Sequence, residues 1–191
     1  MQIQSCAVEC AGAPQVRWVQ GLDAADRDVA RQQARMAMQN CLAAELGCMP
    51  DALELSNVRG QAPQLFRDGV LVESLGCSIS HAPGQALLAW HWSGAVGVDL
   101  QAVDRHATTA ELLAVAKLYF DRKSLEVLMS YWGSALFFEN FTQAWVTQEA
   151  RLKCAGTGLL EWSEALDVHL SAIHCAPVLL GAQFKGAVAW K

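Results

Sequence analysis

The sequence predicts an α+β fold from the order in which helical and strand-like patterns alternate. Helical periodicity covers residues 23–46 and short β-rich runs follow from 53 to 103. Helical periodicity then returns over 109–154, and strand-like runs follow it to the end of the sequence. Helices and strands in separate groups are typical of α+β proteins, and the repeated order is compatible with two lobes of similar build. We place an N-terminal α+β lobe at 1–105 and a C-terminal α+β lobe at 106–191.

The first helix is expected to run from Asp23 to Leu46. Asp23 is a suitable N-cap, because its carboxylate can accept backbone N–H groups of the first turn. Gly47 follows the last helical residue, where glycine commonly ends a helix. Residues four apart share one helix face, and on this helix they are Arg27, Arg31 and Arg35. That face is either a phosphate-binding surface or a solvated charged face.

The strand-rich region is expected to form a meander of Cys77–Ser80, Ala86–Trp92 and Ala95–Leu100. Glycine and proline separate these runs, and Ser93-Gly94 fits a hairpin turn between the last two. Near the end of the sequence, strands are expected over 176–184 and 187–190. They would be joined by a turn near Lys185-Gly186.

Apolar residues of the predicted strands and helices should form the core. Seven of them are the clearest candidates, because they lie in strongly apolar runs or on the apolar stripe of a helix. They are Val96, Val98, Leu100, Phe141, Trp145, Val178 and Leu180.

Composition limits the classes of function. The chain has 191 residues, 53% hydrophobic and 17% charged, so it can bury a substantial core. Its formal net charge of −5 argues against general nucleic-acid binding, which favours a basic face. The seven scattered cysteines lack CxxC or zinc spacing and indicate reduced, buried thiols. No apolar run is long enough to span a bilayer, and the N-terminus lacks the features of a signal peptide. A cytoplasmic protein is therefore expected.

An acid closes an apolar strand in the segment Gly97-Val98-Asp99-Leu100-Gln101. A strand this apolar is expected to be buried on at least one face. A carboxylate there must be hydrogen-bonded, paired or bound to a metal. Taken alone, Asp99 could equally be a turn-forming residue at a strand end.

A second candidate feature is the helix that contains Phe141, Trp145, Glu149 and Lys153, which fall at steps of four on one face. The stripe begins aromatic and ends charged. Its aromatic part should be core, and its charged part should emerge at an edge or a cleft. An ordinary Glu-Lys pair one turn apart is the alternative interpretation.

A third candidate feature is Ser80-His81, at the end of a predicted strand and before Pro83-Gly84. Nucleophilic serine catalysis is not supported, because neighbouring residues of a strand point to opposite faces. The chain also has no G-x-S-x-G elbow.

In combination, these elements resemble the signature of the 4′-phosphopantetheinyl transferase family. The signature is Ser-His, then Gly-x-Asp, then Trp-x-x-x-Glu-Ala-x-x-Lys. Here the distances, 18 positions from His81 to Asp99 and 50 from Asp99 to Glu149, are close to those of single-chain, two-lobed members. The ending Gly156-Thr157-Gly158-Leu159 is similar too, and residues 59–63 resemble a degraded Gly-Lys-Pro segment. The resemblance covers roughly the second two-thirds of the chain.

The resemblance implies a Mg²⁺-dependent enzyme that transfers the phosphopantetheine group of coenzyme A to a serine of an acyl or peptidyl carrier protein. Asp99 and Glu149 would hold the magnesium ion, with Gln101 where many members carry a further acid. Glu149 would also help to deprotonate the serine. Lys153 would contact the pyrophosphate and offset its growing charge.

The resemblance also implies the rest of the coenzyme A site. Ser80 and His81 would lie at the 3′-phosphate or adenosine end, and the phosphate clamp would be completed by Arg31, Arg35 and Arg59. The site is expected in the cleft between two similar lobes, in a monomer. The carrier protein should be acidic around its serine, and its docking patch would be drawn from Arg122, Lys123, Arg151 and Lys153.

Three positions where the family commonly carries charged groups are neutral here, namely Gln101, Gln148 and Thr157. A highly anionic cofactor should bind more weakly in such a site. Two alternatives therefore stay open. One is a degenerate member that binds coenzyme A or a carrier protein with little turnover, and the other is a metal-dependent hydrolase that cleaves a pyrophosphate with water.

Overall fold

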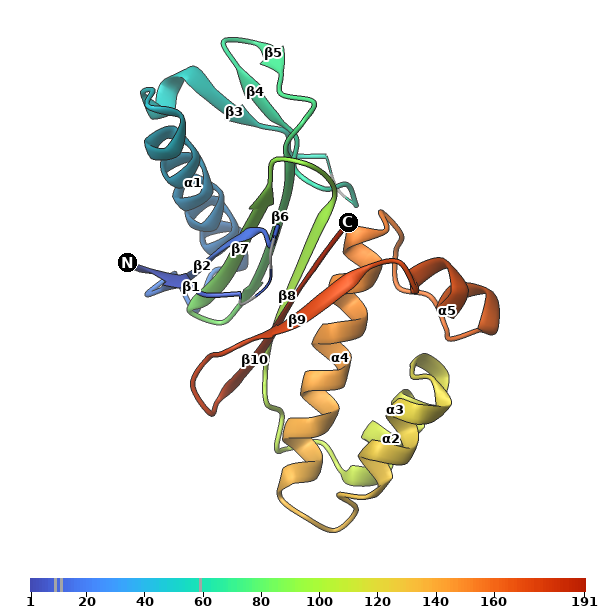
Figure 1. Cartoon of the computed structure of the whole chain (residues 1–191). Helices are drawn as coiled ribbons and strands as arrows, with labels where there is room; N and C mark the ends of the chain where they lie inside the picture. The colour runs from blue at the N-terminus through green and yellow to red at the C-terminus, as the bar shows by residue number, and fades with distance from the viewer. Residues whose placement is uncertain (9, 11, 59) are drawn as a thin grey trace.

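A computed structural model describes residues 1–8, 10, 12–58 and 60–191. As predicted, the fold is mixed α+β, with several small sheets (Figure 1). The helices are α1 (Arg27–Leu46), η1 (Pro50–Ala52), α2 (Thr109–Tyr119), α3 (Arg122–Met129), α4 (Leu136–Cys154) and α5 (Glu164–Leu170). The strands are β1 (Gln2–Cys6), β2 (Gln15–Gln20), β3 (Leu53–Leu55), β4 (Leu65–Arg67), β5 (Val70–Leu71), β6 (Gly76–Ala82), β7 (Gln85–His91), β8 (Val96–Ala102), β9 (His174–Val178) and β10 (Phe184–Trp190).

The first helix begins later than the sequence predicts. Asp26, not Asp23, is the N-cap, and its side chain accepts the backbone N–H groups of Asp28 and Val29. The carboxylate of Asp23 accepts N–H groups from Ala25 and Asp26, so it closes a turn ahead of the helix. Two aspartates three residues apart can each accept such bonds, and the sequence does not distinguish them. Gly47 ends the helix in the left-handed conformation, as predicted, with φ of 63°.

The predicted meander is partly wrong. β6 and β7 do form an antiparallel hairpin, and the four-stranded sheet has the order β1-β2-β7-β6. However, β8 does not pair with β7 across Ser93-Gly94. Both edges of β7 are already occupied, by β2 and by β6, so β8 leaves this sheet and pairs with β10 in the sheet β8-β10-β9.

The predicted C-terminal turn is also misplaced. β9 ends at Val178 and β10 begins at Phe184, so Lys185 and Gly186 lie inside β10. Gly186 is not a turn residue. A Cβ there would lie 2.7 Å from a methyl of Leu87, which shows that the glycine makes room for a side chain of the other sheet.

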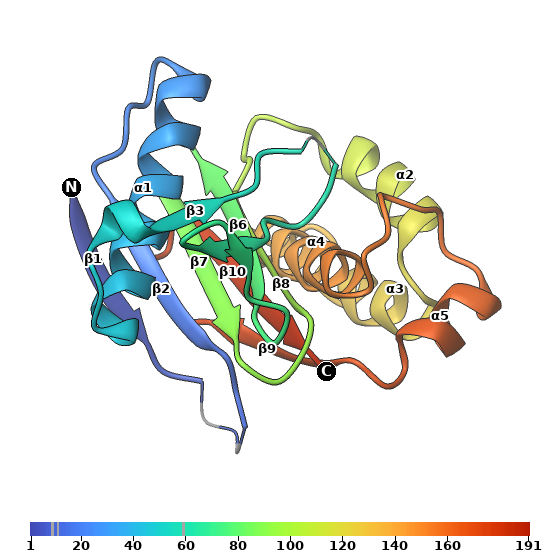
Figure 2. The same ribbon diagram turned by 90° about the horizontal axis from the view of Figure 1, so that it is seen from above.

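The two larger sheets stack between two long helices. Leu88 and Trp90 of β7 pack with α1, whereas Leu87 and Ala89 on the other face of β7 pack with β8 and β10. The far face of β10 packs with α4. The order of layers is therefore α1, sheet, sheet, α4, and Figure 2 shows α1 and α4 on opposite sides of the strands.

The predicted core residues lie mainly in the interface between the sheets and beneath α4. Five are buried, namely Val96, Val98, Leu100, Phe141 and Val178. Trp145 and Leu180 are half-buried and pack against core clusters. The strand and helix periodicity was sufficient to identify them, because burial of an apolar face is what imposes that periodicity.

The position of β8 bears on the predicted division of the chain. This strand lies within the predicted lobe 1–105, yet its hydrogen-bonded partner β10 lies within 106–191. The division at residue 105 stays a prediction. Within the described residues, no helix combines the length and apolar character needed to cross a membrane.

Candidate functional site

Asp99 lies on β8 and is buried, with 6% of its surface exposed. Two side chains contact the same oxygen of its carboxylate. Ser80 Oγ on β6 donates to Oδ1 at 2.8 Å, and Lys153 Nζ on α4 donates to Oδ1 at 2.5 Å. Lys153 also donates to the backbone carbonyl of Val98 at 3.2 Å. The buried charge of Asp99 is thus compensated by one cation and one hydroxyl, as a buried carboxylate requires.

Glu149 lies one helical turn before Lys153 on α4 and is half-buried. Burial is the main cause that raises the pKa of Glu149. The Lys153 ammonium opposes this rise, and the negative charge of Asp99 adds to it. The negative charge of Asp99 thus acts on Glu149, while among the described residues no hydrogen bond or ion pair joins Glu149 to Asp99 or Lys153. A site of this kind favours the uptake of a cation or a proton.

The approach of α4 to β8 depends on Gly97. A Cβ at this position would collide with the backbone carbonyl of Ala150 and would lie 2.5 Å from the backbone nitrogen of Cys154. Because both contacts are with helix backbone, no side chain can move aside. Glycine is therefore required for α4 to lie close enough for Lys153 to reach Asp99.

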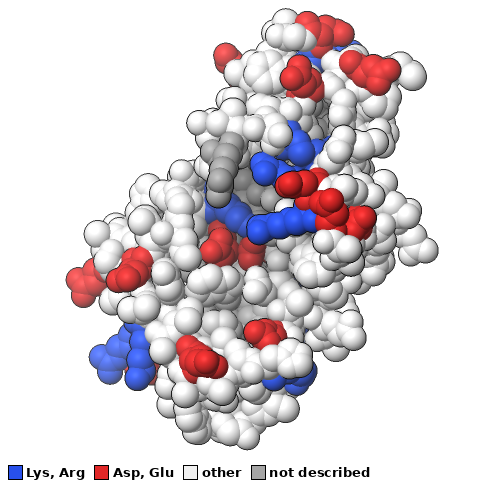
Figure 3. Space-filling model, turned by 180° about the vertical axis from the view of Figure 1, so that it is seen from behind, with Lys and Arg blue, Asp and Glu red and all other residues white. Residues whose placement is uncertain are grey.

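A second group of predicted residues lines a cavity of about 530 Å³ between α1 and the end of β6. Arg27, Arg31 and Arg35 line it from the helix, and His81 lines it from the strand. Figure 3 shows Lys and Arg side chains gathered at a hollow near the middle of one face, with acidic side chains beside them. In a chain of net charge −5, this local concentration of cations is suited to an anionic ligand.

Two of these arginines are held by the chain itself. Arg31 Nη2 donates to Asn57 Oδ1 at 3.0 Å, and Arg35 Nη2 donates to the backbone carbonyls of Leu55 and Ser56 at 2.7 and 2.5 Å. Burial and the neighbouring charge of Arg31 lower the pKa of Arg35. The two guanidinium groups are therefore held beside the cavity by neighbouring groups of the chain.

The side chains of Ser80 and His81 point to different parts of the site. The Ser80 side chain is buried against Asp99, whereas His81 lines the arginine cavity. Burial lowers the pKa of His81, and the positive charges of Arg27, Arg31 and Lys153 lower it further. The alternation of side chains along a strand accounts for the separation.

A smaller cavity of about 400 Å³ connects the two groups. It is lined by Lys153, Gly156 and Thr157 from the end of α4, and it shares Gly60, Gln61, Pro63 and Ile79 with the arginine cavity. Lys153, which contacts Asp99, therefore lines a depression that adjoins the arginine cavity. Arg59, the remaining predicted clamp residue, lies outside the described residues.

The two glutamines singled out in the sequence, Gln101 and Gln148, lie elsewhere. Gln101 is exposed on β8 and lines a mostly apolar cavity of about 320 Å³ with Leu112, Phe141 and Trp145. Gln148 lines a different cavity, between α3 and α4, together with Arg151. Neither amide forms a hydrogen bond with Asp99 or Glu149 among the described residues.

The sequence did not reveal the role of Gly97, and it placed Ser80 at the coenzyme A phosphate without its contact with Asp99. Gly97 could have been noticed as a glycine inside a β-branched strand, which often marks a close approach of backbone. The contact of Ser80 with Asp99 had no such signal, because it joins strands of two different sheets.

The chemistry of the donor set fits magnesium better than a transition metal. The described residues contain no group of three or more His, Cys, Asp or Glu side chains that could hold a metal ion. Magnesium typically uses one or two carboxylates and completes its shell with water and phosphate oxygens. Asp99 and Glu149 could supply those carboxylates.

Compared with models of known protein families and with curated protein sequences, the chain matches none.

Proposed function

We propose that this protein is a magnesium-dependent 4′-phosphopantetheinyl transferase that modifies an acyl or peptidyl carrier protein with coenzyme A. The observation that carries the proposal is the contact of Lys153 with the buried Asp99, 2.5 Å long, on the helix α4 that also carries Glu149. Lys153 lines a depression that adjoins the arginine cavity. Burial, with a smaller contribution from the charge of Asp99, raises the pKa of Glu149. The proposal includes two similar α+β lobes, with this site in the cleft between them.

The reaction is the attack of the carrier serine oxygen on the pyrophosphate of coenzyme A. A bond forms between the serine oxygen and the phosphorus that carries the pantetheine arm. The bond from that phosphorus to the bridging oxygen breaks, and adenosine 3′,5′-bisphosphate leaves. A magnesium ion held by Asp99 and Glu149 would supply positive charge to the phosphate oxygens.

The side chains have separate tasks in this scheme. Glu149 accepts the serine proton as a general base. Lys153 stabilises the charge that develops on the pyrophosphate. Arg31, Arg35 and His81 hold the 3′-phosphate end of coenzyme A in the arginine cavity.

We further propose that the protein acts as a monomer in the cytoplasm on a carrier that is acidic around its serine. The cysteines support a reducing compartment, because all seven are free thiols, although only Cys77 and Cys154 are buried and Cys10 is exposed, contrary to the prediction of buried thiols. Burial raises the pKa of Cys77 to about 12 and of Cys175 to about 11. Thiols of this kind stay protonated and unreactive at neutral pH.

A degenerate binding protein is the alternative, and one observation favours it. The positions where the family commonly carries a further acid and two lysines are Gln101, Gln148 and Thr157, and Thr157 lines the depression beside Lys153. A site with fewer cations would bind the cofactor more weakly and would also stabilise less of the charge that develops during transfer.

The experiment is incubation of the purified protein with coenzyme A, Mg²⁺ and a panel of apo carrier proteins, followed by mass measurement of each carrier. A gain of one phosphopantetheine group that a chelator abolishes is the expected result. Unmodified carriers, together with measurable binding of coenzyme A, would favour the degenerate protein. Release of phosphopantetheine in the absence of any carrier would instead identify a hydrolase.

A further inference from the structure

The two oxygens of the Asp99 carboxylate have different surroundings. Oδ1 accepts hydrogen bonds from Ser80 Oγ at 2.8 Å and from Lys153 Nζ at 2.5 Å. Among the described residues, Oδ2 forms neither a hydrogen bond nor an ion pair. The carboxylate is therefore oriented through one oxygen, and the other is left to act as a ligand.

The hydroxyl of Ser80 is itself fixed. Its oxygen accepts the backbone N–H of Leu100 at 3.2 Å while its proton is donated to Asp99. Ser80 is buried, with 8% of its surface exposed. The Ser80 hydroxyl therefore makes two hydrogen bonds with β8, one with its backbone and one with the Asp99 carboxylate. Together they fix the carboxylate relative to the strand that carries it.

Ser78, two residues earlier on β6, accepts a backbone N–H of β8 as Ser80 does, but it does not donate to a carboxylate. Its hydroxyl accepts the backbone N–H of Val98 at 3.0 Å, and it is buried to a similar extent. Both serines bridge residues 20 positions apart, so β6 and β8 run in the same direction where they meet. Both serines therefore join the two sheets, but only Ser80 contacts a carboxylate.

We propose that Ser80 is a positioning residue for Asp99, and that it presents Oδ2 of this carboxylate to the magnesium ion. The inference rests on the proposed function, and it gives Ser80 a task away from the 3′-phosphate of coenzyme A. Groups that orient a metal ligand commonly change metal affinity by about tenfold or more when they are removed. Ser80 acts through Asp99 and does not touch the reacting atoms.

The test is Mn²⁺ binding, measured by electron paramagnetic resonance, for the wild-type protein and its serine variants without coenzyme A and without a carrier, because Ser78 lines the cavity beside Lys153. Ser80→Ala should weaken Mn²⁺ binding by about tenfold. Ser78→Ala is the matched control: it also leaves one N–H of β8 without its partner but removes no contact with Asp99, so it should bind Mn²⁺ like the wild type. Ser80→Thr, which keeps the hydroxyl, should restore most of the affinity.

Equal Mn²⁺ affinities for Ser80→Ala and Ser78→Ala would overturn the inference. If Ser80→Ala does not fold, Ser80→Cys replaces the hydroxyl with a weaker donor of similar size and should give a smaller loss of Mn²⁺ affinity. A Ser80→Cys protein that binds Mn²⁺ as tightly as the wild type would also overturn the inference.

Two further measurements separate this inference from the proposed function. In the transfer reaction, Ser80→Ala should raise the Mg²⁺ concentration needed for half-maximal rate, with little change in the affinity for coenzyme A measured without metal. A loss of coenzyme A affinity instead would assign Ser80 to the phosphate end and contradict the inference, while leaving the transferase intact. A wild-type protein that binds neither Mn²⁺ nor coenzyme A would overturn the proposed function, and the inference with it.

Discussion

At the scale of single residues, the ionised Glu149 side chain lowers the free energy of unfolding of the protein. Its pKa is raised by burial and by the charge of Asp99, against the opposing effect of Lys153. A carboxyl group whose pKa is higher in the folded state contributes most stability below its unfolded pKa of about 4.3. This contribution is lost as pH rises through the folded pKa. At neutral pH the ionised form therefore destabilises the protein.

We predict that Glu149→Gln raises the free energy of unfolding at pH 7 by about 0.5–2 kcal/mol, the usual gain for a stabilising substitution. The gain should shrink toward zero as pH falls well below about 4.3, to about pH 3, where the carboxyl group is protonated in both states. Urea denaturation at the two pH values measures it. The exposed Glu54→Gln is the control for loss of charge alone. Destabilisation by Glu149→Gln at pH 7 would contradict the proposed electrostatics of the site.

His81 should report on the ligand of the arginine cavity. Burial and the charges of Arg27, Arg31 and Lys153 lower its pKa. A phosphate group bound among these cations would offset their charge and raise the pKa of His81 again. Binding should then take up a proton, so affinity for coenzyme A should increase as pH falls below about 6.5.

Nuclear magnetic resonance titration of the His81 ring with and without coenzyme A tests this prediction. The signal of the exposed His106 should not respond to coenzyme A, and it serves as the control. A His81 titration that does not change on addition of coenzyme A would mean that the phosphate binds elsewhere.

Much of the candidate site could be predicted residue by residue, because it consists of charged groups in apolar sequence. Asp99 interrupts an apolar run, although it lies in the middle of β8 and not at its end as the sequence predicts. Glu149 and Lys153 follow an aromatic stripe on one helix face. The partner of Ser80 could not be predicted, since it depends on which strand lies beside β6. Long-range pairing is set by the packing of whole sheets and leaves little trace in local periodicity.

At the scale of elements, the contact of α4 with β8 is the feature that assembles the site. We predict that Gly97→Ala lowers the free energy of unfolding by about 1–3 kcal/mol, because a Cβ there meets the backbone of α4 and must push the helix away. The same displacement should separate Lys153 from Asp99 and weaken Mn²⁺ binding. Chemical denaturation and Mn²⁺ titration measure the two effects.

Gly158→Ala is the matched control for that substitution. A Cβ at Gly158 meets no heavy atom within 4 Å and its backbone is not in the left-handed region, so little change in stability is expected. If Gly97→Ala were as stable as Gly158→Ala, the close approach of α4 would not be the constraint described above.

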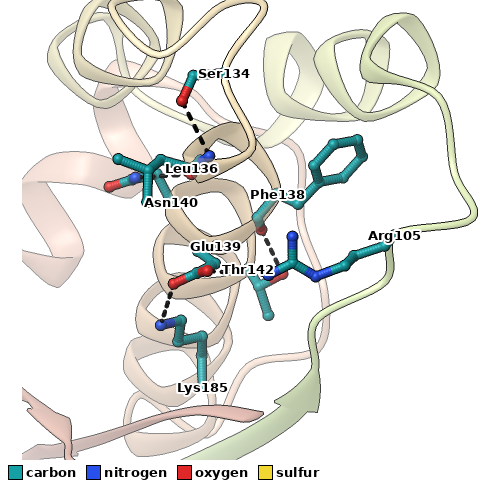
Figure 4. A network of polar contacts seen from close by, with 8 residues as sticks. All are labelled: Arg105, Ser134, Leu136, Phe138, Glu139, Asn140, Thr142 and Lys185. Atoms are coloured by element: carbon teal, nitrogen blue, oxygen red, sulfur yellow. Dashed lines mark hydrogen bonds and ion pairs between the residues drawn. The ribbon is translucent and has the colours of Figure 1, made fainter. Parts of the chain in front are cut away.

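The first turn of α4 is held by a charged cluster that joins three elements (Figure 4). The Glu139 carboxylate accepts from Arg105, in the segment after β8, and from Lys185 on β10, each at 3.0 Å. The hydrogen bond with Lys185 and the charge of Arg105 lower the pKa of Glu139. The cluster fixes the start of α4 against the sheet whose other end carries the contact with Lys153.

We predict that Glu139→Gln costs about 1 kcal/mol of stability at pH 7, near the upper end for partly exposed ion pairs. Because the pKa is depressed, this contribution is present above about pH 4.3 and is lost as pH falls through the folded pKa. The difference from wild type should therefore shrink in acid, as measured by thermal unfolding from pH 7 to pH 3. Glu126→Gln, which breaks the exposed pair with Arg122, should cost less. A pH-independent loss for Glu139→Gln would show that packing, not charge, accounts for it.

Element types were predictable, whereas their pairing was only partly so. The periodicity over α4 and β8 identified both elements, and Gly47 marked the end of α1. The hairpin at Ser93-Gly94 was wrong because turn residues show where a chain can reverse and not which edges remain free. Gly186 was likewise misread, since a glycine that admits Leu87 looks in sequence like a glycine in a turn.

At the scale of the whole molecule, four layers place the two groups of the candidate site on neighbouring surfaces. The arginines of α1 cover the outer sheet near β6, and α4 brings Glu149 and Lys153 against the inner sheet at β8. β6 and β8 lie side by side and are joined through Ser78 and Ser80. The depression that links the arginines to Lys153 runs over this junction. It is here that we expect coenzyme A to lie.

The most direct test of the central claim is the mass of an apo carrier protein after incubation with coenzyme A and Mg²⁺. The decisive comparison is between the Glu149→Gln and Glu164→Gln proteins. The exposed Glu164 lies in the first turn of α5 and controls for the loss of one carboxylate. Wild type and Glu164→Gln should load the carrier equally, and Glu149→Gln should be slower by about 10²–10⁴-fold, the usual contribution of a general base. Equal loading by all three proteins, or none by the wild type on any carrier, would contradict the account.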